Sequence, residues 1–311
     1  MINSHSNVNS MLYICSCKYH PLINLPNVQG VGVGFKEING EATDKLCIQV
    51  LVSEKLDSNS IKNSDKIPAT YMGFETDVVA VGSPRALSLK NKIRPLQAGY
   101  AVSPATQRDY TGSIGCIVEK GTFSKEYFIL SSNHVLSAAN KFRIGYDIVQ
   151  PAAEYGGEAP SDSVARLYKT IPLQFITTLH KPQNTMDCAI AKLNNKSLAS
   201  HIIAKIGKVK GSDAPVIRST VRKVGCATDL TSGAVSSFGI TIKVKYDDGK
   251  EALFVNQLRA KVKCSDGDSG SAIVNQNSKV VGLLVAGDDE GGCIFSSIKP
   301  ILKALDVKIY T

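Results

Sequence analysis

The stretch Cys264-Ser265-Asp266-Gly267-Asp268-Ser269-Gly270-Ser271-Ala272-Ile273 places a serine between two glycines, directly before an apolar strand-like run. A nucleophilic serine needs backbone N–H groups aimed at one point beside it, and glycine permits the tight backbone that this requires. We therefore predict Ser269 as a nucleophile for acyl transfer, with Gly267 and Gly270 providing the tight backbone beside it. The alternative for this tetrapeptide alone is a tight turn without chemistry.

A serine hydroxyl is a weak nucleophile at neutral pH, so the chain must also supply a base. The chain has five histidines: His5, His20, His134, His180 and His201. Of these, His134 lies in Ser-Ser-Asn-His-Val-Leu (131–136), which follows the apolar run 127–130. His134 is the predicted base, and a buried structural histidine is the alternative.

The carboxylate that would orient this base is predicted at Asp187. It lies in Asn-Thr-Met-Asp-Cys-Ala-Ile-Ala (184–191), at the start of an apolar strand where it could be buried against the imidazole. Asp147, Asp162 and Asp213 also lie between the base and the nucleophile in sequence and stay open as alternatives.

The order His134, Asp187, Ser269 resembles that of the chymotrypsin-type serine proteases. Subtilisin-like enzymes run Asp, His, Ser and α/β-hydrolases run Ser, Asp, His, so neither order fits. The resemblance implies a double β-barrel. It also implies that Ser269 attacks the scissile carbonyl, that His134 transfers the proton and that Asp187 holds the imidazole tautomer. The same resemblance implies that the backbone amides of Gly267 and Ser269 form the oxyanion hole.

The chain resembles, more narrowly, a bacterial trypsin-like peptidase family that carries an N-terminal extension and is related to plant narrow-leaf-type proteases. The similar segments span roughly residues 25 to 307. They are VGVGFK (31–36), TDVV (76–79), LSSNHVL (130–136), RIG (143–145), VQP (149–151), GDSGS (267–271) and GLLVAG (282–287). One segment departs, because GCATDLTSG (225–233) stands where a Gly-Arg-Thr-Thr-Gly-like stretch is common, so Cys226 and Asp229 leave the local substrate contacts open.

Strand and turn patterns dominate the chain and predict a mainly β protein with a pair of barrels. Residues 240–246 alternate apolar and polar and predict a hairpin with 252–255, and a second hairpin is predicted from 271–274 and 279–285. Ser297 and Pro300 begin a predicted C-terminal helix that packs on the second barrel.

The domain organisation follows from the same patterns. Residues 1–19 are expected to be a flexible N-terminus, and 20–85 a small α+β unit with strands at 28–38, 46–52 and 75–81. Residues 86–311 are expected to be the trypsin-like protease domain.

Charge and cysteine content indicate which partners and which cellular compartment to expect. The net charge is +9, but the basic residues are dispersed, which favours a solvated surface over nucleic-acid binding. The first 26 residues have no basic n-region or long apolar run, and no stretch is apolar enough to span a bilayer, so we expect a cytoplasmic protein without a membrane partner. The eight cysteines lie singly in apolar runs and are expected to be free thiols.

Two motifs that could hold a metal or cofactor do not fit one. Cys15, Cys17 and His20 lack the second half of a zinc site. Residues 30–34 lack the G-x-G-x-x-G spacing of a dinucleotide loop. We expect no metal and no cofactor, because general-base and oxyanion chemistry suffice for acyl transfer.

Two function classes follow. The first is a serine endopeptidase acting on protein or peptide substrates, and the alternative is a latent or inactive protease-fold binding module. The N-terminal unit could bind a second copy of the chain or a regulatory protein. Lys263, six residues before the nucleophile, argues against an acidic anchor for a basic P1 residue, but Asp288 to Glu290 could enter the same pocket, so the P1 preference stays open.

Overall fold

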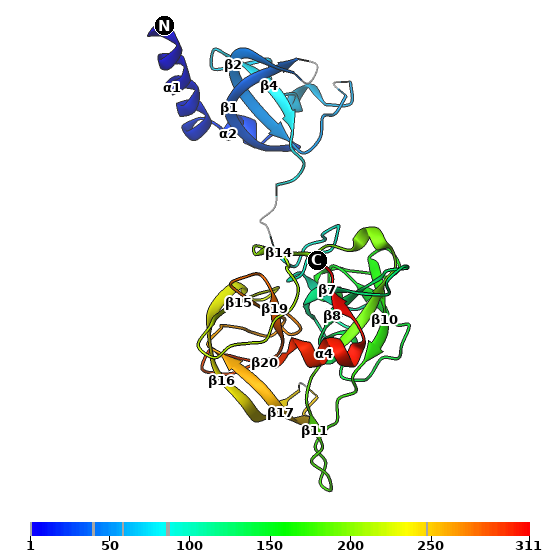
Figure 1. Cartoon of the computed structure of the whole chain (residues 1–311). Helices are drawn as coiled ribbons and strands as arrows, with labels where there is room; N and C mark the ends of the chain where they lie inside the picture. The colour runs from blue at the N-terminus through cyan, green and yellow to red at the C-terminus, as the bar shows by residue number, and fades with distance from the viewer. Residues whose placement is uncertain (1, 39–40, 58, 85–87, 247) are drawn as a thin grey trace. The chain divides into compact units, whose positions relative to one another are not determined.

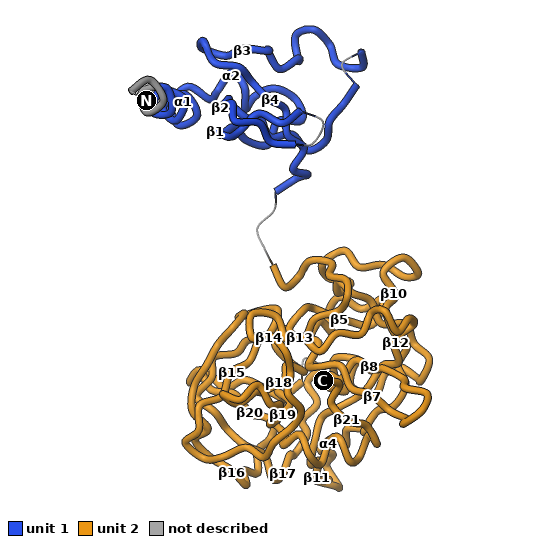
Figure 2. Tube along the Cα trace, turned by 45° about the horizontal axis from the view of Figure 1, so that its top comes forward, with its two compact units in different colours: residues 1–86 blue, residues 87–311 orange. Residues whose placement is uncertain are grey.

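The computed structural model describes residues 2–38, 41–57, 59–84, 88–246 and 248–311. The chain divides into two compact units, unit 1 (Met1–Ala86) and unit 2 (Leu87–Thr311), which Figure 2 shows in separate colours. Residues 85–87, at the boundary expected from the sequence, lie outside the described residues. Each unit is considered by itself.

Unit 1 is built on a sheet with the strand order β1-β2-β4-β3. Strands β1 and β2 pair antiparallel, whereas β2 and β4 pair parallel. Its elements are α1 (Ile2–Cys17), α2 (His20–Ile23), β1 (Val28–Ile38), β2 (Glu41–Val52), η1 (Asn63–Asp65), β3 (Thr70–Tyr71) and β4 (Phe74–Ala80). Unit 1 therefore combines helices with a mixed parallel and antiparallel sheet.

One face of this sheet forms the core of unit 1. Val31 and Val33 stand opposite Val50 and Ile48 in the β1–β2 ladder, so all four side chains lie on one face. Met11 of α1 is buried in the same cluster. Residues 2–17 form α1, which packs against this apolar sheet, whereas we expected a flexible segment over residues 1–19.

The first barrel of unit 2 is a curled antiparallel sheet with the strand order β21-β7-β8-β12-β10-β9-β5-β6 (Figure 1). Its elements are β5 (Ala101–Pro104), β6 (Gly112–Ser113), β7 (Cys116–Lys120), β8 (Glu126–Ser131), α3 (Asn133–Leu136), β9 (Asp147–Val149), η2 (Ala153–Tyr155), β10 (Ser163–Thr170), β12 (Ala189–Leu193), η3 (Lys196–Leu198) and β21 (Lys308–Ile309). Its buried face is rich in branched apolar side chains, as a packed sheet requires.

The second barrel closes on itself. The order β11-β17-β16-β15-β18-β19-β20 is completed by pairing of β17 with β20, so strands β15 to β20 form a ring. Its elements are β11 (Gln183–Asn184), β15 (Thr220–Gly225), β16 (Asp229–Lys245), β17 (Glu251–Ala260), β18 (Ala272–Asn275), β19 (Val280–Gly287) and β20 (Cys293–Ser297), with β13 (Ile202–Ile203) and β14 (Gly207–Lys208) pairing separately. Both predicted hairpins are present, as β16–β17 and β18–β19.

Helix α4 (Ile298–Leu305) links the two barrels. The chain enters it from β20 of the second barrel and continues into β21, which pairs with β7 of the first. Ile298, Ile301 and Leu305 are buried in a cluster formed mostly by the first barrel. The sequence predicted this helix on the second barrel, but it gave no sign that the chain then returns to the first barrel, because a two-residue strand has no readable pattern.

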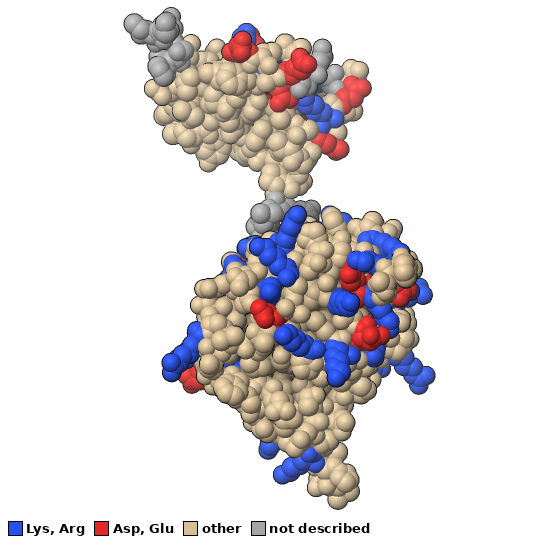
Figure 3. Space-filling model, in the orientation of Figure 1, with Lys and Arg blue, Asp and Glu red and all other residues tan. Residues whose placement is uncertain are grey.

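Charged side chains are dispersed over the surface. Figure 3 shows Lys and Arg side chains of unit 2 spread over the face in view and interspersed with Asp and Glu. Within the described residues, no helix is both long and apolar enough to cross a membrane.

We predict that Ile301→Ala lowers the free energy of unfolding of the whole chain by about 2–5 kcal/mol, because it leaves a cavity under α4. Urea denaturation followed by circular dichroism measures this change. Lys303→Ala, on the exposed side of the same helix, serves as the control and should change stability by less than about 0.5 kcal/mol. Equal stability of both variants would contradict the packing of α4 as described.

Candidate active site

The loop before β18 presents Ser269 by means of two glycines with left-handed backbone. Gly267 has a φ of +94° and Gly270 a φ of +81°, a region that other residues rarely adopt. At Gly270 space is limiting too, because a Cβ there would overlap Oγ of Ser131 and lie 2.9 Å from N of Ser132. This loop of the second barrel therefore lies directly against the end of β8.

Backbone contacts fix the nucleophile loop on the first barrel. The N–H of Ser113 donates to the carbonyl of Ser269 at 2.9 Å, and the Ser113 hydroxyl donates to the carbonyl of Gly267 at 2.8 Å. Within the described part of the chain, the N–H groups of Gly267 and Ser269 donate no hydrogen bond. Two unpaired amides beside a serine are what an oxyanion hole requires.

Strand register brings the predicted base and carboxylate together. In the β8–β12 ladder Ser131 stands opposite Ala189, so the residues that continue past Ser131 meet those that precede Ala189. His134 Nδ1 lies 2.5 Å from Oδ2 of Asp187. The Asp187 carboxylate is fully buried, and its Oδ1 accepts the N–H groups of Asn133 at 2.7 Å and His134 at 3.2 Å. Because a carboxylate only accepts, Nδ1 carries the proton and Nε2 is free as a base.

The three alternative carboxylates are engaged elsewhere. Asp147 accepts a hydrogen bond from Ser163, Asp162 pairs with Lys92, and Asp213 lies 3.8 Å from Lys279. The structure therefore brings Asp187, and none of the other three, to the imidazole.

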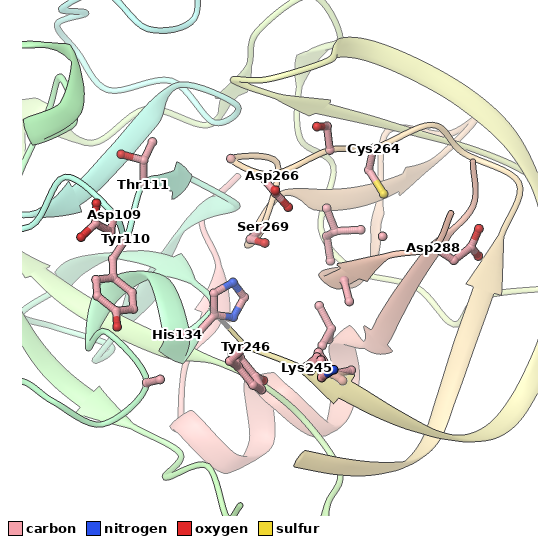
Figure 4. Close-up of a pocket in the computed structure, with 18 of the residues that line it drawn as sticks. Asp109, Tyr110, Thr111, His134, Lys245, Tyr246, Cys264, Asp266, Ser269 and Asp288 are labelled. Carbon is pink, nitrogen blue, oxygen red and sulfur yellow. The ribbon is translucent and has the colours of Figure 1, made fainter. Parts of the chain in front are cut away.

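One cleft of about 400 Å³ contains both His134 and Ser269 (Figure 4). The first barrel supplies His134 and Asp109, and the second supplies Ser269, Cys264 and Tyr246. The described residues include no hydrogen bond from the Ser269 hydroxyl to His134, and such bonds often form only when a substrate is bound.

A buried ion pair lies directly behind the nucleophile. Lys223 Nζ is 2.8 Å from Oδ2 of Asp268, and both side chains are fully buried. The same carboxylate accepts the hydroxyl of Thr228 at 2.6 Å and the N–H groups of Ser265 at 3.0 Å and Ala227 at 3.1 Å. This set of donors compensates the desolvation of the carboxylate and fixes the loop on both sides of Asp268.

Sequence reasoning missed Lys223, because the run Val221-Arg222-Lys223-Val224 does not alternate apolar and polar residues. In the structure Val221 and Lys223 are both buried, while Arg222 between them is partly exposed. Lys223 therefore lies on the inward side of the strand, where a lysine needs a buried partner.

The segment 225–233, which departs from the resembling family, has a structural role here. Ala227 and Thr228 bind Asp268. Cys226 is buried and donates to the carbonyl of Gly267 at 3.1 Å, and burial raises the pKa of its thiol to about 11. Asp229 pairs with Lys205.

Lys263, a candidate specificity residue by its position in the sequence, does not line the cleft beside Ser269. Lys263 is exposed, whereas its neighbour Cys264 lines the cleft together with Asp288 and Asp289. Arg259 Nε lies 2.7 Å from Oδ2 of Asp288, and this hydrogen bond lowers the pKa of the Asp288 carboxyl. Asp288 is therefore already paired with Arg259 of the same chain and is not a free acidic anchor for a basic P1 residue.

Two solved structures share this architecture. Protease A of Thermobifida fusca is 18% identical with a TM-score of 0.50, and the match covers 70% of this chain and 98% of that one. A glutamic-acid-specific serine protease is 21% identical with a TM-score of 0.50, covering 69% of this chain and 100% of that one. At these identities the likeness shows the fold, and it confirms the predicted double β-barrel.

Sequence comparison finds a curated relative, the serine protease HtrA-like protein of Staphylococcus haemolyticus (strain JCSC1435). It is 24% identical over 227 residues, which cover 72% of this chain and 31% of the relative. The chain thus spans about a third of the length of this relative.

The family model described as a trypsin-like peptidase domain matches residues 112–283, which is more than half of the chain. The matched region runs from β6 into β19 and includes His134, Asp187 and Ser269. The chain therefore belongs to the trypsin-like peptidase family.

Proposed function

We propose that the chain is a serine endopeptidase whose triad is His134, Asp187 and Ser269. The observation that carries this proposal is the 2.5 Å contact between His134 and the buried Asp187, in a cleft that Ser269 also lines. A peptidase of this family acts on protein or peptide substrates, which fits an open cleft between two barrels.

The proposed reaction has two halves. Ser269 Oγ attacks the scissile carbonyl carbon while His134 Nε2 takes the hydroxyl proton, and the oxyanion that forms is held by the amides of Gly267 and Ser269. The C–N bond then breaks, His134 gives its proton to the leaving amine, and an acyl-enzyme remains. Water repeats the attack with His134 as base and releases the acid and Ser269.

Asp187 acts on the imidazole rather than on the substrate. Its carboxylate accepts the Nδ1–H bond and stabilises the imidazolium that forms in each half of the reaction. Because the carboxylate also binds the backbone N–H groups of Asn133 and His134, its position is fixed before substrate arrives.

The oxyanion loop is proposed to be formed without proteolytic activation. Lys223 of the same chain supplies the cation that pairs with the Asp268 carboxylate, so this carboxylate needs no amine generated by cleavage of the chain. The ion pair holds Asp268 inside the second barrel and so supports the amides on either side of it.

A latent or inactive binding module is the alternative. It would not need the unpaired amides of Gly267 and Ser269, nor a fully buried ion pair to support them, so these features favour an active enzyme.

We propose residues 20–85 as an accessory unit and 86–311 as the protease domain. The accessory unit would bind a second copy of the chain or a regulatory protein. A cytoplasmic location is also proposed, and it is supported by eight cysteines that are all free thiols.

We predict that a fluorophosphonate probe labels the wild-type chain, and that Ser269→Ala and His134→Ala each abolish labelling. The first removes the nucleophile and the second removes its base. Gel fluorescence after a timed reaction measures the label. His180→Ala, at an exposed histidine, is the matched control and should label normally. Undiminished labelling of Ser269→Ala would sink the proposed nucleophile, and an unlabelled but folded wild type would favour the latent module.

We predict that Lys223→Met lowers the free energy of unfolding by about 3–5 kcal/mol, because it leaves the Asp268 carboxylate buried without its cation. Fluorophosphonate labelling should also slow by roughly 10- to 100-fold, as for loss of oxyanion support. Lys243→Met, at an exposed lysine of the same barrel, should change neither quantity.

The double variant Lys223→Met with Asp268→Asn separates the two effects. Removing the unpaired charge should restore part of the stability while labelling stays slow. Fast labelling of this folded double variant would show that the ion pair does not support the oxyanion loop.

A further inference from the structure

Tyr246 is the one side chain from the second barrel that contacts the carboxylate of Asp187 among the described residues. Its hydroxyl lies 3.4 Å from Oδ2, the oxygen that also accepts His134 Nδ1. Its ring meets the imidazole of His134 edge to face, with centroids 5.6 Å apart and planes at 69°. Figure 4 shows the tyrosine directly beside His134 at the edge of the cleft.

This hydroxyl completes the surroundings of a buried charge. Oδ1 of Asp187 accepts two backbone N–H groups, from Asn133 and His134, and Oδ2 accepts His134 Nδ1. A carboxylate has about four acceptor positions, so Tyr246 supplies the fourth donor. Burial, together with the charge of Asp187, raises the pKa of Tyr246, which keeps the phenol protonated and able to donate.

Tyr246 is held in place by its own packing. It lies at the end of the β16–β17 hairpin, where its N–H donates to the carbonyl of Lys250 at 2.9 Å and its carbonyl accepts Gly249 N–H at 2.8 Å. Its ring packs perpendicular to Phe175, at 5.6 Å and 89°. The Lys250 ammonium covers the Phe175 ring at 5.2 Å, so the hairpin end and the phenylalanine form one packed group.

We propose that Tyr246 is a positioning residue, which holds the Asp187 carboxylate and the His134 ring in register from the opposite barrel. The proposal rests on the triad proposed above. A hydrogen bond to Oδ2 opposes rotation of the carboxylate away from Nδ1, and the aromatic edge blocks rotation of the imidazole toward the second barrel. The first barrel restrains Oδ1 through the N–H groups of Asn133 and His134, and Tyr246 adds a restraint on Oδ2 from the second barrel.

A substrate contact is the competing role, because Tyr246 also lines the cleft. The two roles differ in what they do to a small reagent that reaches Ser269 without filling the cleft. Positioning changes the reactivity of Ser269 toward any electrophile, whereas a substrate contact changes only the affinity for a peptide.

The test uses the full chain with Tyr246→Phe, which keeps the ring and removes the hydroxyl, and Tyr246→Leu, which removes both. The second-order rate of inactivation by diisopropyl fluorophosphate should fall about tenfold for Tyr246→Phe, the loss expected for one hydrogen bond to a charged group, and further for Tyr246→Leu. With p-nitrophenyl acetate, kcat should fall by the same factor while KM stays within about twofold of wild type.

Tyr127→Phe is the matched control, since Tyr127 packs on Tyr310 at the β21 side of the first barrel and should react like wild type. Circular dichroism and urea midpoints establish that the variants are folded. Inactivation of folded Tyr246→Phe at the wild-type rate overturns the positioning role, and so does a change confined to the KM of a peptide substrate. A wild type that does not react at all overturns the proposed triad instead, and with it this inference.

Discussion

The close approach of two backbones at Gly270 is the constraint on which the site depends. The loop that carries Ser269 lies against the end of β8, so near that Gly270 has no room for a side chain beside Ser131. The chain continues from β8 into α3, which carries His134. The proposed nucleophile of one barrel and the proposed base of the other are therefore placed by a main-chain contact, which is less adjustable than a contact between side chains.

Two buried carboxylates then fix the chemistry on either side of that contact. Asp187 lies behind the imidazole and Asp268 behind the nucleophile, and each is surrounded by donors from backbone and side chains. The two carboxylates differ in the partners that stabilise their buried charge. Asp268 forms an ion pair with Lys223, whereas Asp187 accepts hydrogen bonds from backbone N–H groups, a tyrosine hydroxyl and an imidazole. A site that must stabilise a transient imidazolium benefits from this difference, since a permanent cation beside Asp187 would oppose it.

The sequence predicted those parts of the site that have local signals. Glycines around Ser269 and strand patterns beside His134 and Asp187 are readable because backbone conformation and burial leave marks on neighbouring residues. Lys223 was not readable, because the run Val221-Arg222-Lys223-Val224 has no strand alternation that would place the lysine inward. Tyr246 could not be predicted either. It is 59 residues from Asp187 in the chain, and the two side chains come together only where the two barrels meet. The packing of α1 was hidden for the same reason, since a polar helix with a few apolar residues acquires its place only from the sheet beside it.

The pairing of β21 with β7 bears on the order in which the molecule can be made. Lys308 and Ile309 stand opposite Glu119 and Val118. Strand β7 of the first barrel therefore pairs on this side with residues that are translated almost two hundred positions later. During vectorial synthesis the first barrel leaves the ribosome with an open edge at β7, and α4 and β21 cover it last. Completion of the barrel that carries His134 is thereby tied to synthesis of the barrel that carries Ser269.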